Sequence, residues 1–195
     1  MRTPPLIPTH PIIEEILDSH RDHARGDERG WAGYRGHVYR VFHFARALSP
    51  DIDDRDDKLA IAAAFHDLDV FSALDYLGPS LRAQSDWLRR TGRATWEPEL
   101  AVVVAEHHRL YPCSGPYAVL ADAFRRADLI DLSQSLVRDG IPRSYVREVR
   151  RTFDVQTFFT RVIPRAVLRN MARRPLDPFP HMRARRALAQ PRSTS

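Results

Sequence analysis

Two stretches of the chain are apolar on every side, and they organise the fold that the sequence predicts. Nearly every residue from 59 to 71 is apolar, and residues 100–105 are apolar without interruption. A helix without a polar face is buried inside a protein rather than lying on its surface. We therefore expect two core helices, the first over residues 55–69 and the second over residues 97–109.

Amphipathic patterns predict the helices that cover this core from the N-terminal side. Apolar residues recur at helical spacing over residues 11–23 and again over residues 35–48. Gly26, Gly30 and Gly33 fall between these two segments and interrupt the pattern. We expect them to form a loop that joins the two helices.

The second half of the chain predicts three further helices. They are expected over residues 79–92, from residue 115 to shortly before residue 140, and over residues 142–173. The last helix should bend at Pro164, because proline removes a backbone donor and crowds the preceding turn. No segment alternates as a half-buried strand does, so the expected fold class is all-α.

Length and composition fit one folded domain followed by a short tail. The chain has 195 residues, which is enough to bury a core, and no repeat divides it. We expect a single helical domain over residues 1–174. Proline and arginine dominate residues 175–195, so we expect this tail to be extended or disordered.

The positive charge of the chain comes almost entirely from arginine. The formal net charge is +5, and Lys58 is the only lysine. Arginine binds phosphate and carboxylate oxygens in a bidentate manner, which favours an anionic ligand. The arginines of the tail could contact phosphates of nucleic acid, but no aromatic residues are interleaved with them. Nucleic acid is therefore not an expected partner.

A cytoplasmic location is expected from the cysteine content and the N-terminus. Cys113 is the only cysteine, so no internal disulfide can form. The N-terminal residues lack the continuous apolar core of a signal peptide. No run approaches the roughly 18 apolar residues of a membrane span. We expect no membrane partner, and the sequence leaves the oligomeric state open.

Ionisable residues within the expected core mark the candidate chemistry. His66 and Asp67 end the first apolar run, and their burial costs several kcal/mol unless they are paired or bound to a metal. His37 lies beside the apolar face of the preceding helix. On a later helix Asp131 lies on the apolar line with Asp128 beside it, and spacing does not choose between them. Such a nitrogen and oxygen site suits Mn, Fe, Co, Ni, Zn or Mg.

The ordered set of His37, His66-Asp67 and Asp128 resembles the HD-domain superfamily of metal-dependent phosphohydrolases, which are all-helical proteins. The flanks of the first histidine and of the last aspartate share in the likeness, which covers roughly residues 35–133. The resemblance implies a single-domain HD-type helical bundle with a metal site in its core. It also implies that His37, His66, Asp67 and Asp128 bind one divalent metal ion.

One position departs from the family pattern and leaves the handling of protons open. Val70 stands where HD-type nucleotidases carry a glutamate that is a candidate for taking the proton of the attacking water. We expect Asp67, Asp69 and Glu106 to be the catalytic residues. Asp75 is a further candidate for the proton.

Four residues are expected to contact the substrate, namely Arg40, His107, His108 and Arg109. The alternative for the histidines is an interaction with the C-terminal end of the helix dipole, and for the arginines an ion pair at the helix surface. The chain has no histidine between Asp67 and His107, where relatives that use two metals supply extra ligands. A single ion is therefore expected.

The expected function is hydrolysis of a small phosphorylated metabolite or nucleotide by a metal-activated water. Two alternatives stay open. One is a hydratase or hydrolase of a small neutral molecule, as in cyanamide-hydratase-like relatives. The other is a non-catalytic regulator that binds a nucleotide or nucleic acid and keeps the metal for stability. Arginines in the pocket would favour the phosphohydrolase. A tight apolar cavity would favour the hydratase or hydrolase of a neutral molecule, and a metal enclosed by protein on all sides would favour the regulator.

Overall fold

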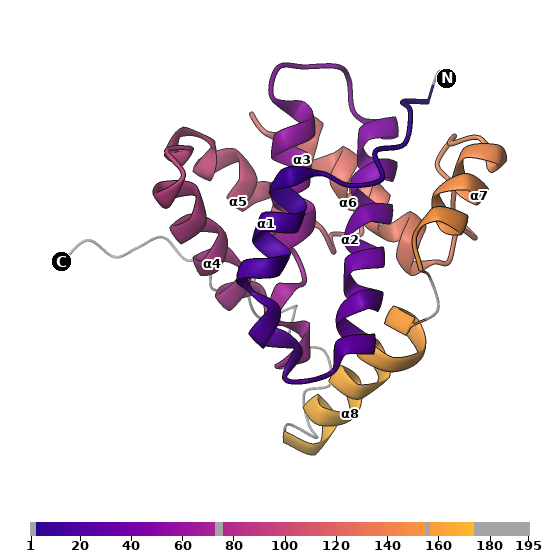
Figure 1. The fold of residues 1–195 in the computed structure, drawn as a ribbon. Helices are drawn as coiled ribbons and strands as arrows, with labels where there is room; N and C mark the ends of the chain where they lie inside the picture. The colour runs from indigo at the N-terminus through magenta and orange to yellow at the C-terminus, as the bar shows by residue number, and fades with distance from the viewer. Residues whose placement is uncertain (1–2, 73–75, 155–156, 174–195) are drawn as a thin grey trace.

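Every regular element in the described part of the chain is a helix, which confirms the expected all-α fold class. The computed structural model describes residues 3–72, 76–154 and 157–173, so the expected tail over residues 175–195 and Asp75 lie outside the described residues. None of the described helices is long and apolar enough to cross a membrane. The α-helices (Figure 1) are α1 (Pro11–Ser19), α2 (Glu28–Leu48), α3 (Arg55–Phe65), α4 (Leu77–Arg90), α5 (Glu97–Glu106), α6 (Ala118–Leu132), α7 (Arg143–Thr152) and α8 (Ile163–Arg173).

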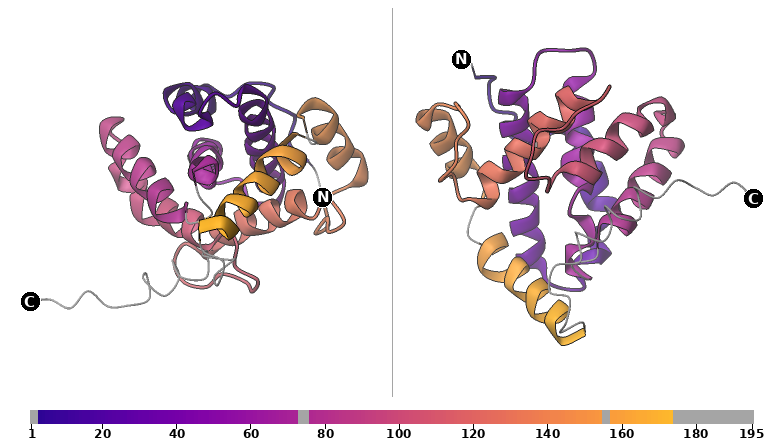
Figure 2. Two further views of the ribbon diagram at one scale, coloured as in Figure 1. Left: turned by 90° about the horizontal axis from the view of Figure 1, so that it is seen from below. Right: turned by 180° about the vertical axis from the view of Figure 1, so that it is seen from behind.

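Helix α3 lies in the middle of the bundle, as its apolar sequence predicts. Its side chains from Leu59 to Phe65 are fully buried. The helix packs against α1, α2, α4 and α5, and the view from below shows the other helices arranged around it (Figure 2). Helix α5 contacts α3 and α6, but only Leu100, Val103 and Val104 of it are buried, so the expectation of a second helix buried on all sides is wrong.

Both core helices end earlier than expected. The candidate histidine and aspartate residues at their C-terminal ends therefore follow the helices instead of lying within the last turn. Helix α3 ends at Phe65 rather than near residue 69, and a short 3-10 turn, η2 (Leu68–Phe71), follows it. Helix α5 ends at Glu106 rather than at residue 109. The His66-Asp67 and His107-His108 pairs therefore lie just beyond the last turns of two neighbouring helices.

Helix α2 begins at Glu28, so the loop expected around Gly30 and Gly33 is wrong. Asp27 caps the helix by accepting a hydrogen bond from the backbone N–H of Gly30 at 3.0 Å. A Cβ atom at Gly33 would lie 2.7 Å from the backbone nitrogen of Phe158, well inside van der Waals contact. Gly33 therefore lets a later segment approach the helix closely rather than ending it.

The region over residues 142–173 is not one bent helix. After α7, Phe153 is extended (φ −121°, ψ 130°) and stacks on Tyr39 with ring centroids 4.8 Å apart. A π-helix, η4 (Phe158–Val162), then leads into α8, whose second residue is Pro164. The ring of Pro164 crowds the preceding turn, which explains the irregular backbone there. The break comes earlier than the expected bend because Phe153 leaves the helix to pack in the core.

Candidate metal centre

Six histidine and aspartate side chains from different helices converge near the middle of the bundle. Two of them lie within helices, in α2 and α6, and the other four follow the ends of α3 and α5. All are nearly or fully buried except one histidine side chain, which is 27% exposed. We call this group the His–Asp cluster, and its members are His37, His66, Asp67, His107, His108 and Asp128.

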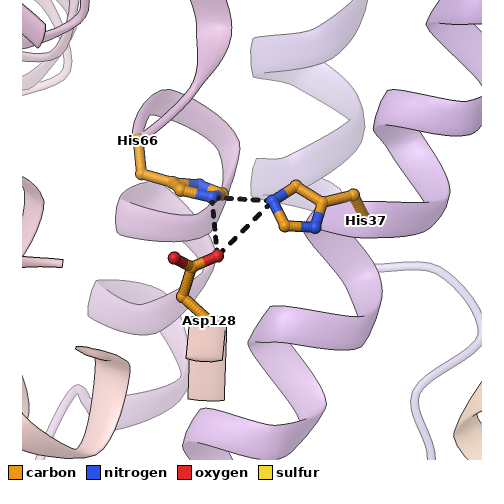
Figure 3. Close-up of side chains that lie close together, drawn as sticks. All are labelled: His37, His66 and Asp128. Atoms are coloured by element: carbon orange, nitrogen blue, oxygen red, sulfur yellow. Dashed lines mark hydrogen bonds and ion pairs between the residues drawn. The ribbon is translucent and has the colours of Figure 1, made fainter. Parts of the chain in front are cut away.

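His37, His66 and Asp128 form the first half of the His–Asp cluster, and Figure 3 shows their side chains pointing toward one another. The Nε2 atoms of His37 and His66 are 2.9 Å apart. Each of these atoms lies 3.7 Å from Oδ1 of Asp128. The three donor atoms are close enough together to surround one ion.

Asp67, His107 and His108 form the second half, and the two carboxylates connect it to the first. Nε2 of His107 lies 3.3 Å from Oδ1 of Asp67, whose other oxygen lies 3.7 Å from Nε2 of His37. Nδ1 of His108 lies 3.4 Å from Oδ2 of Asp128, whose Oδ1 faces the first half. Each carboxylate therefore directs one oxygen toward each half of the cluster.

In three histidines of the cluster, the ring nitrogen on the far side from the cluster, Nδ1, also has a hydrogen-bonding partner. His66 and His107 lie with Nδ1 at 2.8 and 2.6 Å from the backbone carbonyl three residues earlier. Nδ1 of His37 lies 2.7 Å from Oδ2 of Asp131. A carbonyl oxygen only accepts hydrogen bonds, so Nδ1 of His66 and His107 carries the hydrogen and the neutral ring presents a lone pair at Nε2. Metal-binding histidines are commonly held in this way.

Several buried atoms of the cluster have no hydrogen-bond partner in the described part of the chain. They are Oδ1 of Asp67, Nε2 of His107 and both carboxylate oxygens of Asp128. Buried polar atoms are nearly always satisfied, because each unpaired one costs about 1–3 kcal/mol. A cation among these atoms would satisfy them. It would also separate the two Nε2 atoms that face each other. The buried histidine and aspartate groups could therefore hold a metal ion.

The electrostatics of the cluster favour positive charge at the same place. Burial by itself lowers the pKa of His66, but the carboxylates of Asp67 and Asp128 outweigh burial and raise it to about 9. Burial raises the pKa of Asp128, yet the neighbouring His108 and His66 hold it well below its usual range. The carboxylates stay ionised and attract a cation, whether that is a proton on His66 or a metal ion.

Asp131 and Arg40 lie behind His37 rather than in front of it. Both are fully buried, and Nε of Arg40 donates to Oδ1 of Asp131 at 2.6 Å. Arg40 also donates to the carbonyl of Asp154. Arg40 was expected to contact the substrate, and the structure places its guanidinium on Asp131, which it holds against His37. Of the two carboxylates that spacing left open, Asp128 faces the cluster and Asp131 supports it.

The two other expected catalytic carboxylates do not join the cluster. Asp69 lies in the 3-10 turn, where its Oδ1 is 3.0 Å from Nδ1 of His23. Glu106 accepts a hydrogen bond from Arg109 at 3.1 Å. The backbone turns sharply after Asp67, so residues only two positions apart point to different surroundings. Asp67 alone of the three expected catalytic residues is in the cluster.

Tyr76 contacts the His–Asp cluster, although the sequence predicted no role for it. Its hydroxyl is 2.6 Å from Nε2 of His108, and its side chain is nearly buried. Burial and the charge of Asp67 raise the pKa of Tyr76 well above its usual value. The neutral hydroxyl can accept from Nε2–H and leave Nδ1 of His108 directed at the cluster. Local spacing in the sequence assigns no role to this tyrosine.

A cavity of about 260 Å³ opens beside the His–Asp cluster, and three cluster residues form one of its walls. Nε of Arg109 is buried there without a hydrogen-bond partner among the described residues. Arg125 donates to Asp122 and to the carbonyl of Arg109. The cavity thus combines guanidinium groups with an apolar wall, and it is lined by His107, His108, Arg109, Leu110, Arg125, Asp128, Leu129 and Leu132.

A scan against models of known protein families, a search of curated proteins and a search of solved structures each returned no match. The resemblance to HD domains therefore rests on the residues that carry it in the sequence. The geometry of the cluster and of the cavity beside it supports the function proposed below.

Proposed function

We propose that the protein is a metal-dependent phosphohydrolase that acts on a small phosphorylated molecule. The observation that carries the proposal is the set of buried, unpartnered donor atoms in the His–Asp cluster, which adjoin a cavity lined by two arginines. A divalent ion bound there would polarise a phosphoryl oxygen and lower the pKa of a bound water. The substrate would reach the cluster through the cavity that borders His107, His108 and Asp128.

The residues of the cavity support a small anionic substrate. Arg109, which pairs with Glu106, keeps a buried Nε donor without a partner among the described residues, and Arg125 donates to the backbone carbonyl of Arg109. Guanidinium groups bind phosphoryl oxygens and stabilise the charge that develops on them. The volume of about 260 Å³ favours a compact molecule over a long one. Leu110, Leu129 and Leu132 add apolar surface to the lining, although Leu110 is 81% exposed.

The bridging carboxylates favour a second ion, which goes beyond the single ion expected from the sequence. The first half of the cluster offers His37, His66 and one oxygen each of Asp67 and Asp128. The second half offers two imidazoles and the remaining oxygens, again directed at one another. Pairs of ions that share carboxylates can bind both the attacking and the leaving oxygen of a phosphoryl group.

Elemental analysis of the purified protein tests the proposal first, followed by a panel of phosphomonoesters and phosphodiesters with the identified metal restored. We expect up to two ions per chain, and we expect Asp67→Ala to lose metal and turnover together. Asp86→Asn, an exposed change on α4, is the control and should alter neither. Full activity in metal-free protein or in Asp67→Ala would show that the mechanism is wrong.

The three leucines of the cavity specifically favour one alternative, a hydratase or hydrolase of a small neutral molecule. Arg109→Gln separates the two functions. If the substrate is a phosphate ester, the variant should raise KM roughly tenfold, because a charge-assisted hydrogen bond is lost. If the substrate is neutral, KM should stay nearly constant. The substrate panel therefore includes small neutral nitriles and amides.

A further inference from the structure

Several arginines among the described residues form ion pairs with acidic residues, whereas those around α7 do not. Arg21, Arg35, Arg46, Arg55, Arg89, Arg126 and Arg161, for example, each form an ion pair with aspartate or glutamate. Among the described residues, no carboxylate oxygen lies within 4.0 Å of a guanidinium nitrogen of Arg138, Arg143, Arg147 or Arg151. Like charges gathered without counter-charges repel one another, so this group is arranged at a cost to stability.

These arginines border one cavity rather than one flat helix face. The cavity has a volume of about 750 Å³ and receives Arg143, Arg147, Arg150 and Arg151 from α7 and Arg138 from the loop before it. Phe159, from the π-helix, contributes an aromatic ring. None of the residues that line this arginine cavity lines the cavity beside the His–Asp cluster. Helix α7 lies at the edge of the bundle, on the side away from α4 and α5 (Figure 1).

Parts of the arginine cavity are fixed before any ligand binds. Arg150 donates to Oγ of Ser135 at 3.1 Å, which connects α7 to the preceding loop. Tyr145 and Val149 are buried and hold α7 against the bundle, and the buried Val146 lines the cavity. Glu148, the one acidic residue of α7, lines a neighbouring hollow together with Arg147 and Arg151. The arginine cavity itself has no acidic lining residue.

We infer that the arginine cavity binds a nucleoside polyphosphate, with the phosphates on the arginines of α7 and the base against Phe159. Five guanidinium groups offer more donors than one phosphate can accept, so several linked phosphates are favoured. The volume falls in the range of small-molecule sites, which is about 300–1,000 Å³. A single-stranded nucleic acid would need a series of stacking aromatics, and this cavity has one. The inference does not depend on the function of the His–Asp cluster.

Isothermal titration calorimetry of the full chain with ATP and with inorganic tripolyphosphate tests this inference. We expect one saturable site for ATP, and roughly tenfold or weaker binding of both ligands in the double variant Arg147→Gln/Arg151→Gln. The double variant Arg82→Gln/Arg90→Gln changes two exposed arginines of α4 by the same net charge and should bind as the unmodified protein does. Phe159→Ala should weaken the binding of ATP and leave that of tripolyphosphate unchanged.

Several results would overturn the inference. Equal weakening in both double variants would show that only net charge matters. Loss of ATP binding in Asp67→Ala, with the arginine variants unaffected, would place the nucleotide at the His–Asp cluster. Tighter binding of a single-stranded oligonucleotide than of ATP would identify a nucleic-acid surface instead. Circular dichroism and thermal unfolding of each variant exclude misfolding as the cause.

Discussion

In the His–Asp cluster His37, His66 and His107 are held in place by hydrogen-bonding partners behind them, whereas most arginines around α7 have no side-chain partner among the described residues. Asp131 fixes His37, Arg40 fixes Asp131, and backbone carbonyls fix His66 and His107. Of the arginines that line the arginine cavity, only Arg150 has a side-chain hydrogen-bond partner among the described residues. Folding therefore orients most of the donor atoms of the first group, whereas four of the five arginines of the second are free to adjust to an anion.

This difference indicates which kind of ligand each region is suited to bind. A buried, rigid set of donors discriminates by distance and coordination number, so it suits a metal ion. Exposed guanidinium groups adapt to the ligand and remain open to salt, so they suit a polyanion of moderate affinity. Variants in each region test whether the two regions bind their ligands independently.

The largest effect is expected from Asp128→Asn, because Asp128 directs an oxygen to each half of the cluster. Metal content should fall close to zero, and turnover should fall more than about a hundredfold, which is the upper range for residues that only support a ligand. Metal analysis and steady-state kinetics measure this, with Asp86→Asn as the control. Binding of ATP at the arginine cavity should not change, and a parallel loss there would mean that the two regions are coupled.

An intermediate effect is expected from Asp131→Asn. The amide can still contact His37, but it no longer carries the charge that Arg40 balances, so metal affinity should fall about 10- to 100-fold. Competition with a chelator measures the affinity. Arg46→Gln, which breaks the pair between Arg46 and Asp56 far from the cluster, controls for a general loss of stability. Unchanged affinity in Asp131→Asn would show that Asp131 has a purely structural role.

A smaller effect, on stability, is expected from Gly33→Ala. The added Cβ meets the backbone at Phe158, so the free energy of unfolding should fall by about 1–3 kcal/mol. Chemical denaturation measures the change. Gly78→Ala is the matched control, because its Cβ would lie 3.5 Å from the nearest atom, on the flexible side chain of Arg82. Equal stability in both variants would show that the bundle adjusts easily around α2.

The sequence predicted the parts of the fold that depend on burial alone. The apolar run before His66 predicted a core helix, and α3 is buried on all sides. The run before His107 predicted a second one, but only one face of α5 is buried. Helical spacing placed His37 and Asp128 near the same core, and the structure brings them together with His66 and Asp67. These predictions succeed because the period of apolar residues reports which face is buried.

The sequence could not predict contacts between segments far apart in the chain. Gly33 has the local signature of a helix breaker, and only the approach of Phe158 explains its place inside α2. Arg40 and Asp131 are separated by ninety-one positions, so their pairing is invisible to local spacing. The turn after Asp67, which separates it from Asp69, likewise depends on how the ends of the helices pack.

The stacking of Phe158 on His37, with ring centroids 4.1 Å apart, defines the smallest piece of the chain that can serve as a working unit. The stretch with the HD-like pattern, residues 35–133, omits this aromatic ring and would leave one face of the imidazole open to solvent. A truncated fragment that ends with that stretch would lack one wall of the His–Asp cluster. Any minimal version of this protein must therefore retain the chain through the π-helix.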